Sequence, residues 1–327
     1  MSSRMTVREI ARLAGVSVAT VSRVYNGVGQ VAPQTRQKVL DAIEATGYRP
    51  DPVGQALAAG RHGALGLVFP GLSGPYFAEL IQGFESEAVR SRSSVHILCT
   101  HLRDDSDAQV IEMARRVDGV AVLGGTVADE ALAKLADLVP VVVMAGDAPE
   151  RATSVRTENR DASAALTAHL LVDHELRDLI FVGGPDGSPD VRERYLGFTR
   201  AHEALGLTAA EPLRVAMQSH DGVRATGELL DRGDRPGALV CANDEIAVGA
   251  LVAALGRGLR VPEDLVLTGF DDAPMAALMS PPLTTVRQPV RELAARAAAV
   301  LLGTGPAEDV LLPTDLVVRA SCGCGRR

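Results

Sequence analysis

The sequence predicts an α/β protein in which a small helical N-terminal unit precedes two doubly wound parallel-sheet lobes. Two short helices with recognisable caps and a glycine turn between them occupy Thr6–Asn26. From Ala64 onward, short apolar runs alternate with glycine-rich turns and helical stretches, as in parallel sheets that helices cover on both faces. These runs form two series along the chain, which indicates two lobes.

The segment Thr6–Asn26 carries the signals of two consecutive helices. Thr6 and Glu9 form a capping box, which predicts that a helix begins here, and Gly15 supplies the left-handed residue that ends it. Ser17 can cap a second helix. Two helices joined by a tight glycine turn are a helix-turn-helix, the unit that lays its second helix in the major groove of DNA. A helical corner in a small bundle is the alternative, but the agreement of caps, turn and apolar spacing favours DNA binding.

Apolar residues at helical spacing predict a small core shared by three helices. The third helix begins at Pro33 and ends before Gly47 and Pro50. The apolar residues of the three helices in turn are Val7, Ile10, Ala11 and Ala14; Val18, Val21 and Val24; and Val39, Leu40 and Ile43. We therefore expect a three-helix headpiece at residues 1–50.

Residues 51–61 connect this headpiece to the rest of the chain and contain DPVGQALAAG. Asp51 can cap a short helix and Pro52 suits its first turn, but Gly54 destabilises a helix by about 1 kcal/mol relative to alanine. So short a helix is marginal in water. The segment is therefore either a flexible linker or a hinge helix that forms on DNA, with Leu57 as an apolar wedge in the minor groove.

The candidate strands fall into two series. The first comprises Ala64–Phe69, Val95–Cys99, Gly119–Leu123 and Val141–Met144, and the second Leu179–Val182, Ala238–Cys241 and Leu265–Thr268. Ligands of open parallel sheets bind beyond the carboxyl ends of the strands. Polar residues gather at these ends, namely Ser73, Tyr76, Asn243, Asp244, Asp271 and Asp272.

Charge is divided unevenly along the chain. Residues 1–61 contain eight arginine and lysine residues against four acidic ones, a net charge of +4, which leaves −12 for the remainder of a chain whose total is −8. A basic head on an acidic body fits a DNA contact confined to one end. No apolar run approaches the roughly 18 residues of a membrane span, and charged residues interrupt the N-terminus where a signal peptide needs an apolar core. We therefore expect a cytoplasmic protein without membrane contact.

The four cysteines predict neither a disulfide framework nor a metal site. Cys99 and Cys241 lie in apolar runs, as small core residues do. Cys322 and Cys324 form a C-x-C pair near the C-terminus with no second ligand pair nearby, which falls short of the four ligands of a structural zinc site. We expect a disordered C-terminal end rather than a reactive tail, and we predict no metal and no cofactor.

Stretches throughout the chain resemble the LacI/GalR family of transcriptional regulators, and they occur in the family's order. They are EIARLAGVSVATVSRVYNG, TRQKVLDAIEATGYRP, LSGPYFAELIQGFE, VDGVAVL, RERYLGF, ANDEIAVGAL, GLRVPEDLVLTGFDD and SPPLTTVRQP. Such a set is far more specific than a helix-turn-helix alone. The resemblance implies a headpiece at 1–50, a hinge helix at 51–61 and, at 62–327, a two-lobed effector-binding and dimerisation core of periplasmic-binding-protein type.

The resemblance also implies how that core is divided and how it works. The N-terminal lobe would comprise about 62–160 and 288–320 and the C-terminal lobe about 161–287, with crossings near Asn159–Asp161 and Val286–Pro289. Members of the family act as homodimers on palindromic operators, because two-fold symmetry of the protein sets the spacing of the half-sites. The implied function is a DNA-binding repressor, not an enzyme, whose operator affinity is controlled by a small effector, a sugar or sugar derivative.

The family's base-reading positions match Val18, Ala19 and Arg23. Arg23 can donate to O6 and N7 of guanine, a contact worth roughly 1–3 kcal/mol of discrimination. Val18 and Ala19 offer only apolar contacts, and Val18 can equally belong to the headpiece core. Leu57 matches the hinge leucine that the family inserts at the operator centre. The remaining DNA-binding positions match phosphate contacts, which set the register on DNA without reading its sequence. Their alternative role is helix capping or contact with solvent. They are Ser17, Thr20, Ser22, Asn26 and Thr35.

By similarity, the effector site lies between the lobes. It comprises Ser73, Tyr76, Phe77, Asp161, Arg192, Asn243 and Asp271. Arg192 and Asp271 can form a paired donor and acceptor for vicinal hydroxyl groups, while Tyr76 or Phe77 offers a ring to an apolar face. A solvated arginine, a helix-capping aspartate and a core phenylalanine are the alternatives.

Three features depart from the family's pattern. Pro52 and Gly54 make the hinge helix weaker or kinked. Ala32 stands where the family usually caps its third helix with serine, a loss of about 1 kcal/mol unless Pro33 compensates. Met217 stands where many members carry an aromatic residue in the effector pocket, so softer contacts replace stacking there.

An enzyme and a secreted sugar-binding protein are the competing functions. The chain has no G-x-S-x-G, H-E-x-x-H or G-x-G-x-x-G motif, and GGPDG at 183–187 has the wrong spacing for the last of these. A secreted sugar-binding protein would share the core, but it would need an export signal and no basic headpiece. Both alternatives predict the loss of specific DNA binding in a gel-shift experiment.

Overall fold

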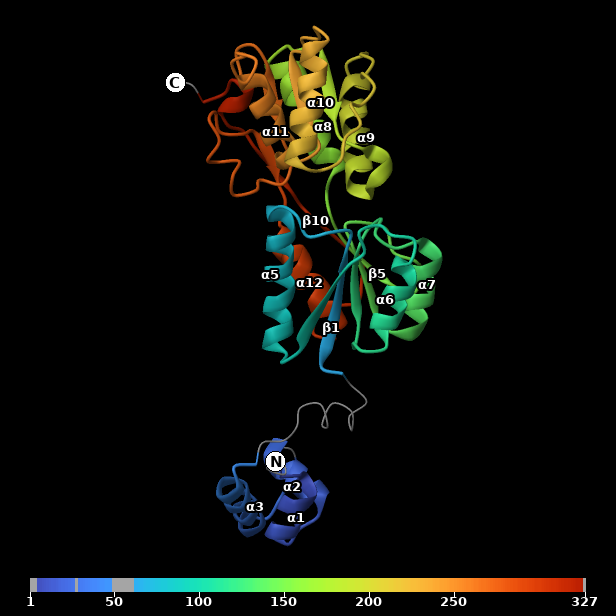
Figure 1. Cartoon of the computed structure of the whole chain (residues 1–327), viewed down its shortest axis with the longest axis vertical. Helices are drawn as coiled ribbons and strands as arrows, with labels where there is room; N and C mark the ends of the chain where they lie inside the picture. The colour runs from blue at the N-terminus through green and yellow to red at the C-terminus, as the bar shows by residue number, and fades with distance from the viewer. Residues whose placement is uncertain (1–4, 27–28, 49–61, 326–327) are drawn as a thin grey trace. The chain divides into compact units, whose positions relative to one another are not determined.

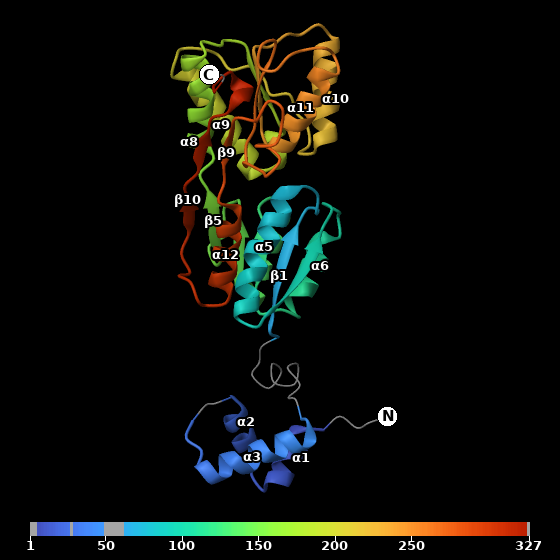
Figure 2. The same ribbon diagram turned by 90° about the vertical axis from the view of Figure 1, so that its left-hand side faces the viewer.

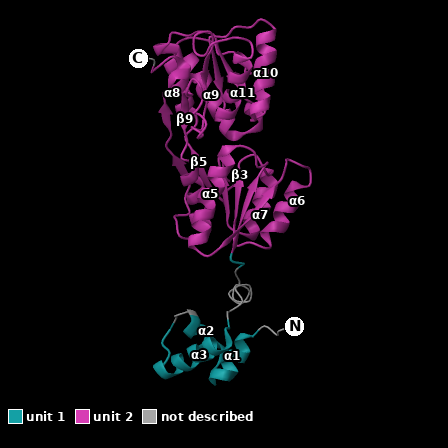
Figure 3. Ribbon diagram, turned by 60° about the vertical axis from the view of Figure 1, so that its left-hand side comes forward, with its two compact units in different colours: residues 1–63 teal, residues 64–327 magenta. Residues whose placement is uncertain are grey.

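The computed structural model describes residues 5–26, 29–48 and 62–325 (Figure 1). The chain forms two compact units, Met1–Gly63 and Ala64–Arg327, which Figure 3 colours separately. The predicted hinge helix and Leu57 lie outside the described residues. Among the helices of the described ranges, none has the length and apolar character needed to span a membrane.

Unit 1 is a three-helix headpiece. Its helices are α1 (Val7–Ala14), α2 (Val18–Asn26) and α3 (Pro33–Thr46). The predicted capping box is confirmed, because the Glu9 amide donates to Thr6 Oγ1 and the Thr6 amide donates to Glu9 Oε2 at 2.7 Å. Gly15 ends α1 with a φ of +65°, a conformation that glycine adopts without steric cost. The predicted helix-turn-helix is therefore present.

A small apolar core holds the three helices together. Its buried members are Ile10, Ala11, Ala14, Val21, Val24, Val39 and Tyr48. The prediction that Leu40 belongs to this core is wrong, since its side chain is exposed. A helix turns by about 100° per residue, so the neighbour of buried Val39 points away from the core.

The N-terminal lobe of unit 2 contains a six-stranded parallel sheet. Its strands are β1 (Ala64–Phe69), β2 (Ser94–Cys99), β3 (Val120–Leu123), β4 (Val141–Met144), β5 (Thr153–Thr157) and β10 (Val310–Leu312). They lie in the order β10-β5-β4-β3-β1-β2. The order reverses between β1 and β3, and open α/β sheets bind ligands beyond the carboxyl ends of the strands at such a point.

Helices cover both faces of this sheet. One face packs against α5 (Pro75–Arg90) and α12 (Val290–Leu301), and the other against α6 (Ser106–Ala114) and α7 (Asp129–Leu138) (Figure 1). Alternate residues of β1 serve the two faces, since Leu67 packs with α5 and α12 while Val68 packs with α6 and α7. Burial on both faces explains why the strands read as continuous apolar runs.

The C-terminal lobe contains a second parallel sheet in the order β6-β7-β8. Its strands are β6 (Leu179–Val182), β7 (Ala238–Cys241) and β8 (Val266–Thr268). Its helices are α8 (Arg160–Ala168), which a π-helical turn (His169–Asp173) extends, α9 (Pro189–Glu203), α10 (Ser219–Asp231) and α11 (Asp244–Leu255). One apolar cluster unites sheet and helices, and the prediction of two parallel-sheet lobes is confirmed.

The described part of the chain passes between the lobes three times (Figure 2). β5 leads to α8, β9 (Thr285–Arg287) leads to α12, and β10 leads to β11 (Asp315–Val317), which pairs antiparallel with β9. Beyond β11, the short turn Ala320–Cys322 packs against β8, and Cys322 is buried in the core of the C-terminal lobe. The assignment of all of residues 288–320 to the N-terminal lobe and the expectation of a disordered end are therefore wrong, because a third crossing returns the chain to an apolar core.

α3 begins without a side-chain cap, because Ala32 occupies the N-cap position ahead of Pro33. We expect Ala32→Ser to stabilise the headpiece by about 1 kcal/mol, since the hydroxyl can accept a first-turn amide proton. Amide exchange of the α3 peptides in the full chain, measured by mass spectrometry, should slow by about fivefold. Gln34→Ser lies in the same turn beyond the cap and should not slow it. Unchanged exchange in Ala32→Ser would contradict the assignment of the cap.

Candidate DNA interface and effector site

The second helix of the headpiece presents one exposed face. Val21 and Val24 point into the core, while Val18, Ala19 and Arg23 are exposed. The Val18 side chain retains 42% of its accessible surface, so it does not belong to the headpiece core. The predicted base-reading side chains therefore lie on the face of α2 that a DNA groove can meet.

Predicted phosphate-contacting hydroxyl groups lie at the start of this helix. The Thr20 amide donates to Ser17 Oγ at 3.1 Å, and the two hydroxyl oxygens lie 2.9 Å apart. Helix N-termini attract phosphate, because free amides and the helix dipole meet there. Ser22 is exposed and Thr35 is half-buried in the first turn of α3. The side chain of Asn26, like Leu57, lies outside the described residues.

The buried guanidinium of Arg194 is the centre of the predicted effector region. Its Nε donates to Asn159 Oδ1 at 2.7 Å and its Nη1 donates to the Ala242 carbonyl at 2.6 Å. Its central carbon lies 3.9 Å from the centre of the Phe270 ring. Burial of a cation is costly unless polar groups surround it, and here Asn159 of the first crossing and the carbonyl after β7 supply them.

Two carboxylates approach this guanidinium. Nη1 lies 3.6 Å from Asp271 Oδ1, and Nη2 lies 3.7 Å from Asp190 Oδ2. Both separations exceed hydrogen-bond length, so these groups keep hydrogen-bonding capacity for a ligand. Asp271 has a φ of +115°, a conformation that is strained for aspartate and that concentrates at functional sites.

A ring of hydrogen bonds, closed by the ion pair of Arg194 with Asp271, joins these groups to both crossings near the site. Gln288 Nε2 donates to Asp271 Oδ1 at 2.6 Å, and Thr157 Oγ1 donates to Gln288 Oε1. Asn159 Nδ2 donates to the Thr157 carbonyl at 3.0 Å, and Arg194 then closes the ring between Asn159 and Asp271. The position of the crossing segments is therefore tied to the charges of the site.

Burial controls the ionisation of the acidic groups. It raises the pKa of Asp190 to about 6, although the Arg194 charge opposes the shift. It also raises the pKa of Asp244, to which the negative charge of Asp271 contributes, and the pKa of Asp271 itself, against the influence of Arg194 and Gln288. Burial raises the pKa of the Tyr76 hydroxyl as well, which keeps it a proton donor. The site therefore favours ligands that donate hydrogen bonds and relieve the desolvated carboxyl groups.

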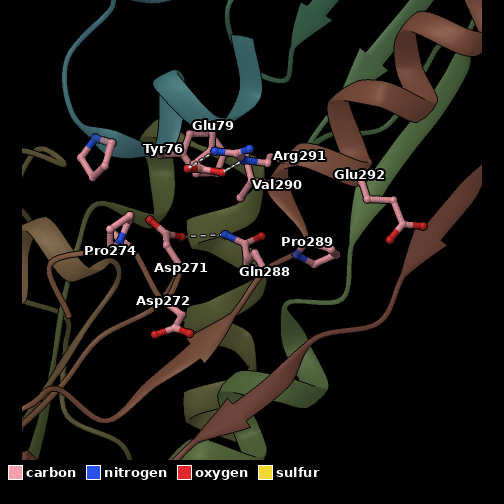
Figure 4. Close-up of a pocket in the computed structure, with 12 residues that line it drawn as sticks. Tyr76, Glu79, Asp271, Asp272, Pro274, Gln288, Pro289, Val290, Arg291 and Glu292 are labelled. Atoms are coloured by element: carbon pink, nitrogen blue, oxygen red, sulfur yellow. Dashed lines mark hydrogen bonds and ion pairs between the residues drawn. The ribbon is translucent and has the colours of Figure 1, made fainter. Parts of the chain in front are cut away.

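A pocket of about 410 Å³ opens beside Asp271 at the junction of the lobes (Figure 4). The start of α5 contributes Tyr76 and Glu79, and Glu79 accepts from Arg291 Nη2 at 3.0 Å. Gln288 forms part of the opposite wall. The volume suits a small polar metabolite.

The predicted effector residues divide by position. Tyr76 and Asp271 line the pocket. Ser73 Oγ donates to Gln218 Oε1 at 2.6 Å, which joins the two lobes. Phe77 packs against the core of the N-terminal lobe, edge to face with Phe69 at 5.5 Å, and Asn243 caps α11 by accepting from the Ile246 amide. Ser73, Phe77 and Asn243 thus support the structure around the pocket rather than line the pocket itself.

Two predicted residues lie elsewhere. Arg192 is exposed, and the guanidinium that pairs with Asp271 is that of Arg194. Residues two apart on a helix point about 200° away from each other, so only one arginine of RERYLGF can face the cleft. Asp161 is exposed at the start of α8 and pairs with Arg200 on the outer surface. The pairing of Arg192 with Asp271 is therefore corrected to Arg194.

Sequence reasoning missed Arg194, Asp190 and Gln288. A signal for Arg194 existed, because it lies three residues after buried Val191 and four before buried Phe198, on the inward stripe of α9. The role of Gln288 depends on a crossing segment that meets Asp271 in space, and no local pattern reveals such a contact.

The raised pKa of Asp190 predicts a pH dependence of the core's stability. Between about pH 4 and pH 6 the unfolded carboxyl loses its proton first, so the free energy of unfolding falls as pH rises, by roughly 3 kcal/mol at most from this group. In Asp190→Asn this fall should be shallower, as urea unfolding at a series of pH values will show. Asp161→Asn, on the exposed surface, should leave the slope unchanged. A slope that does not differ between Asp190→Asn and wild type would refute the assignment.

Comparison with known proteins identifies the family. Residues 6–51 match the bacterial regulatory proteins of the lacI family, and residues 168–322 match the periplasmic binding protein-like domain. The HTH-type transcriptional repressor PurR of Mannheimia succiniciproducens is 32% identical and aligns over 97% of this chain and 98% of its own. The HTH-type transcriptional regulator DegA of Bacillus subtilis is 30% identical over the same shares. These relatives are regulators of transcription rather than enzymes.

Solved structures agree with this assignment. The lac repressor dimer bound to operator and the anti-inducer ONPF superposes with a TM-score of 0.84 at 26% identity, covering 98% of this chain and 99% of that one. The transcriptional regulator CelR in complex with cellobiose gives 0.70 at 28% identity, covering 97% and 100%. The chain therefore belongs to the LacI family of DNA-binding bacterial transcriptional regulators, with an N-terminal helix-turn-helix and a periplasmic-binding-protein-like effector core.

Proposed function

We propose that this regulator is a repressor that binds a palindromic operator as a homodimer in the bacterial cytoplasm. A small effector, a sugar or sugar derivative, binds between the lobes of the core and controls the affinity for the operator. The observation that carries the proposal is the buried pairing of Arg194 with Asp190 and Asp271 beside a pocket, in a chain whose headpiece presents a reading helix.

The exposed face of α2 supports the DNA half of the proposal. Arg23 reads guanine through O6 and N7, while Val18 and Ala19 meet the methyl groups of thymine. Leu57, by family resemblance, inserts at the operator centre. The hydroxyl and amide groups that hold the phosphates and fix the register are those of Ser17, Thr20, Ser22, Asn26 and Thr35.

The chemistry of the cleft supports a polyhydroxylated effector. A hydroxyl group can donate to the Asp271 or Asp190 carboxylate and accept from the Arg194 fork at the same time. The Tyr76 ring beside them offers an apolar surface to the face of a sugar ring. CelR binds cellobiose in its solved complex, which accords with an effector of this class.

Contacts across the lobes offer a route for coupling. Ser73 of the N-terminal lobe donates to Gln218 of the C-terminal lobe at 2.6 Å. The Glu245 carboxylate lies so close to Gly74 that a β-carbon there would meet it at 1.7 Å. A ligand that displaces these contacts shifts the balance between open and closed lobes, and the closed-lobe geometry sets how two headpieces engage a palindrome.

The surface of the core supports a homodimer. Large apolar side chains are exposed at Val89 of α5, Ile97 of β2, Val252 and Leu255 of α11, and Leu278. Exposed apolar area of this kind favours burial against a second copy. The lac repressor that resembles this chain was solved as a dimer on its operator.

Arg23→Ala tests the reading helix. After operator selection from genomic fragments, this variant should lose discrimination at one base pair of each half-site by about 1–3 kcal/mol, because the bidentate contact to guanine is gone. Arg12→Ala removes the same charge from α1 and should weaken binding to all sequences about equally. If Arg23→Ala keeps the wild-type base preference, Arg23 does not read a base.

Arg194→Lys tests the effector cleft. Lysine keeps the charge but lacks the planar fork, so the variant should bind the effector at least about tenfold more weakly. The effector is first found by screening sugars and, separately, nucleobases for a change in operator binding. Arg192→Lys, on the exposed side of α9, is the matched control and should respond as wild type does. Operator binding without effector verifies that each variant is folded. An effector response unchanged in Arg194→Lys would refute the role of Arg194 in effector binding. A response to nucleobases alone would refute the sugar assignment.

A further inference from the structure

Four metal-ligating side chains converge in the C-terminal lobe, away from the cleft. They are His169, His174, Cys322 and Cys324, and their ligand atoms all lie within 4.8 Å of one another. His169 is the first residue of the π-helical turn after α8 and His174 follows that turn, while the cysteines lie at the end of the described chain. The C-x-C pair thus has the second ligand pair that its sequence neighbourhood lacks.

Four of the six distances between these ligand atoms are close to the edges of a tetrahedron around a metal ion. His169 Nε2 lies 3.2 Å from His174 Nε2 and 3.7 Å from both sulfur atoms, and Cys324 Sγ lies 3.4 Å from His174 Nε2. Around a tetrahedral zinc ion, with bonds of about 2.0–2.1 Å to nitrogen and about 2.3 Å to sulfur, neighbouring ligand atoms lie about 3.3–3.8 Å apart. The side chains therefore stand close to the geometry of a bound ion.

The histidine side of the cluster is held in place from behind. His169 Nδ1 lies 2.7 Å from the Asp173 carboxylate, which orients the ring so that Nε2 faces the cysteines. Metal-binding histidines commonly make such a bond from their second ring nitrogen. The π-helical turn His169–Asp173 widens the end of α8 and brings His174 beside His169, and such turns are frequent at functional sites.

The cysteine side is anchored to the sheet of the lobe. Ser321 Oγ donates to the Leu267 carbonyl of β8 at 2.6 Å and accepts from the Thr284 amide at 2.8 Å. Cys322 is buried, and Gly323 between the cysteines has a φ of +99°, which lets the chain turn Cys324 back toward the histidines. Both ligand pairs are thus presented by ordered backbone.

We propose that His169, His174, Cys322 and Cys324 bind a structural Zn²⁺ ion that fastens the C-terminal end of the chain to the C-terminal lobe. A set of two thiolates and two imidazoles binds Zn²⁺ in preference to Mg²⁺ or Ca²⁺, because the latter two ions favour oxygen ligands. Four protein ligands complete the tetrahedron, so the ion has a structural role rather than a catalytic one. By fixing the residues after β11, the ion holds one end of the third crossing between the lobes.

Metal content tests the proposal. The full chain, expressed without an affinity tag and purified under reducing conditions, should contain close to one zinc ion per chain by plasma mass spectrometry. Exchange with Co²⁺ should produce the visible bands of tetrahedral cobalt and thiolate-to-cobalt charge transfer. Cys322→Ser and Cys324→Ser should each lose the zinc and these bands, whereas Cys99→Ser should retain both. His220→Asn, at an exposed site, serves as the histidine control for His174→Asn.

A measurement on the wild-type chain makes the test independent of how well the variants fold. Removal of zinc with a chelator should lower the melting temperature of the core, and stoichiometric Zn²⁺ should restore it. A reduced wild-type chain that contains no zinc and takes up no Co²⁺ would overturn the proposal. So would zinc retained by the Cys322→Ser/Cys324→Ser double variant, or an intact mass showing a Cys322–Cys324 disulfide in a metal-free chain.

Discussion

The effector core depends on the solvation of one buried cation. Arg194 is 3% exposed, and the hydrogen bonds of its guanidinium to Asn159 and to the Ala242 carbonyl replace the water that the group has lost. A buried charge left without partners costs several kcal/mol. This requirement fixes the first crossing, the end of β7 and the loop that carries Asp271 relative to α9. The closed ring through Gln288 and Thr157 extends the same constraint to the second crossing.

Such a ring makes the cleft a natural place for regulation. Its carboxyl groups are desolvated and face a single guanidinium, so a ligand that supplies hydroxyl donors changes the energy of the ring directly. Because Asn159 and Gln288 stand on segments that join the lobes, a change in the ring is also a change in lobe closure. The zinc cluster would act at the other end of the same architecture, since it holds the chain that follows β11. The proposed effector cleft between the lobes and the proposed zinc site in the C-terminal lobe would thus use different chemistry.

Most of the fold could be predicted from the sequence, because its signals are local. The capping box of Thr6 and Glu9 and the continuous apolar strands report directly on their own elements. The site was harder, since RERYLGF contains two arginines and only helical periodicity separates Arg194 from Arg192. Strand β11 was not predictable, because it depends on pairing with β9. The ligand cluster was not predictable either, because its residues lie about 150 positions apart in the chain. A C-x-C pair looks incomplete until the fold brings His169 and His174 beside it.

We propose that the effector cleft and the reading helix α2 share one free energy of coupling. Linkage requires that an effector which changes operator affinity by some factor has its own affinity changed by the same factor when the operator is bound. Isothermal titration of the effector into the free protein and into the protein–operator complex measures this directly. We expect two effector affinities whose ratio equals the effector-induced ratio of operator affinities. Identical effector affinities in the two titrations would contradict it.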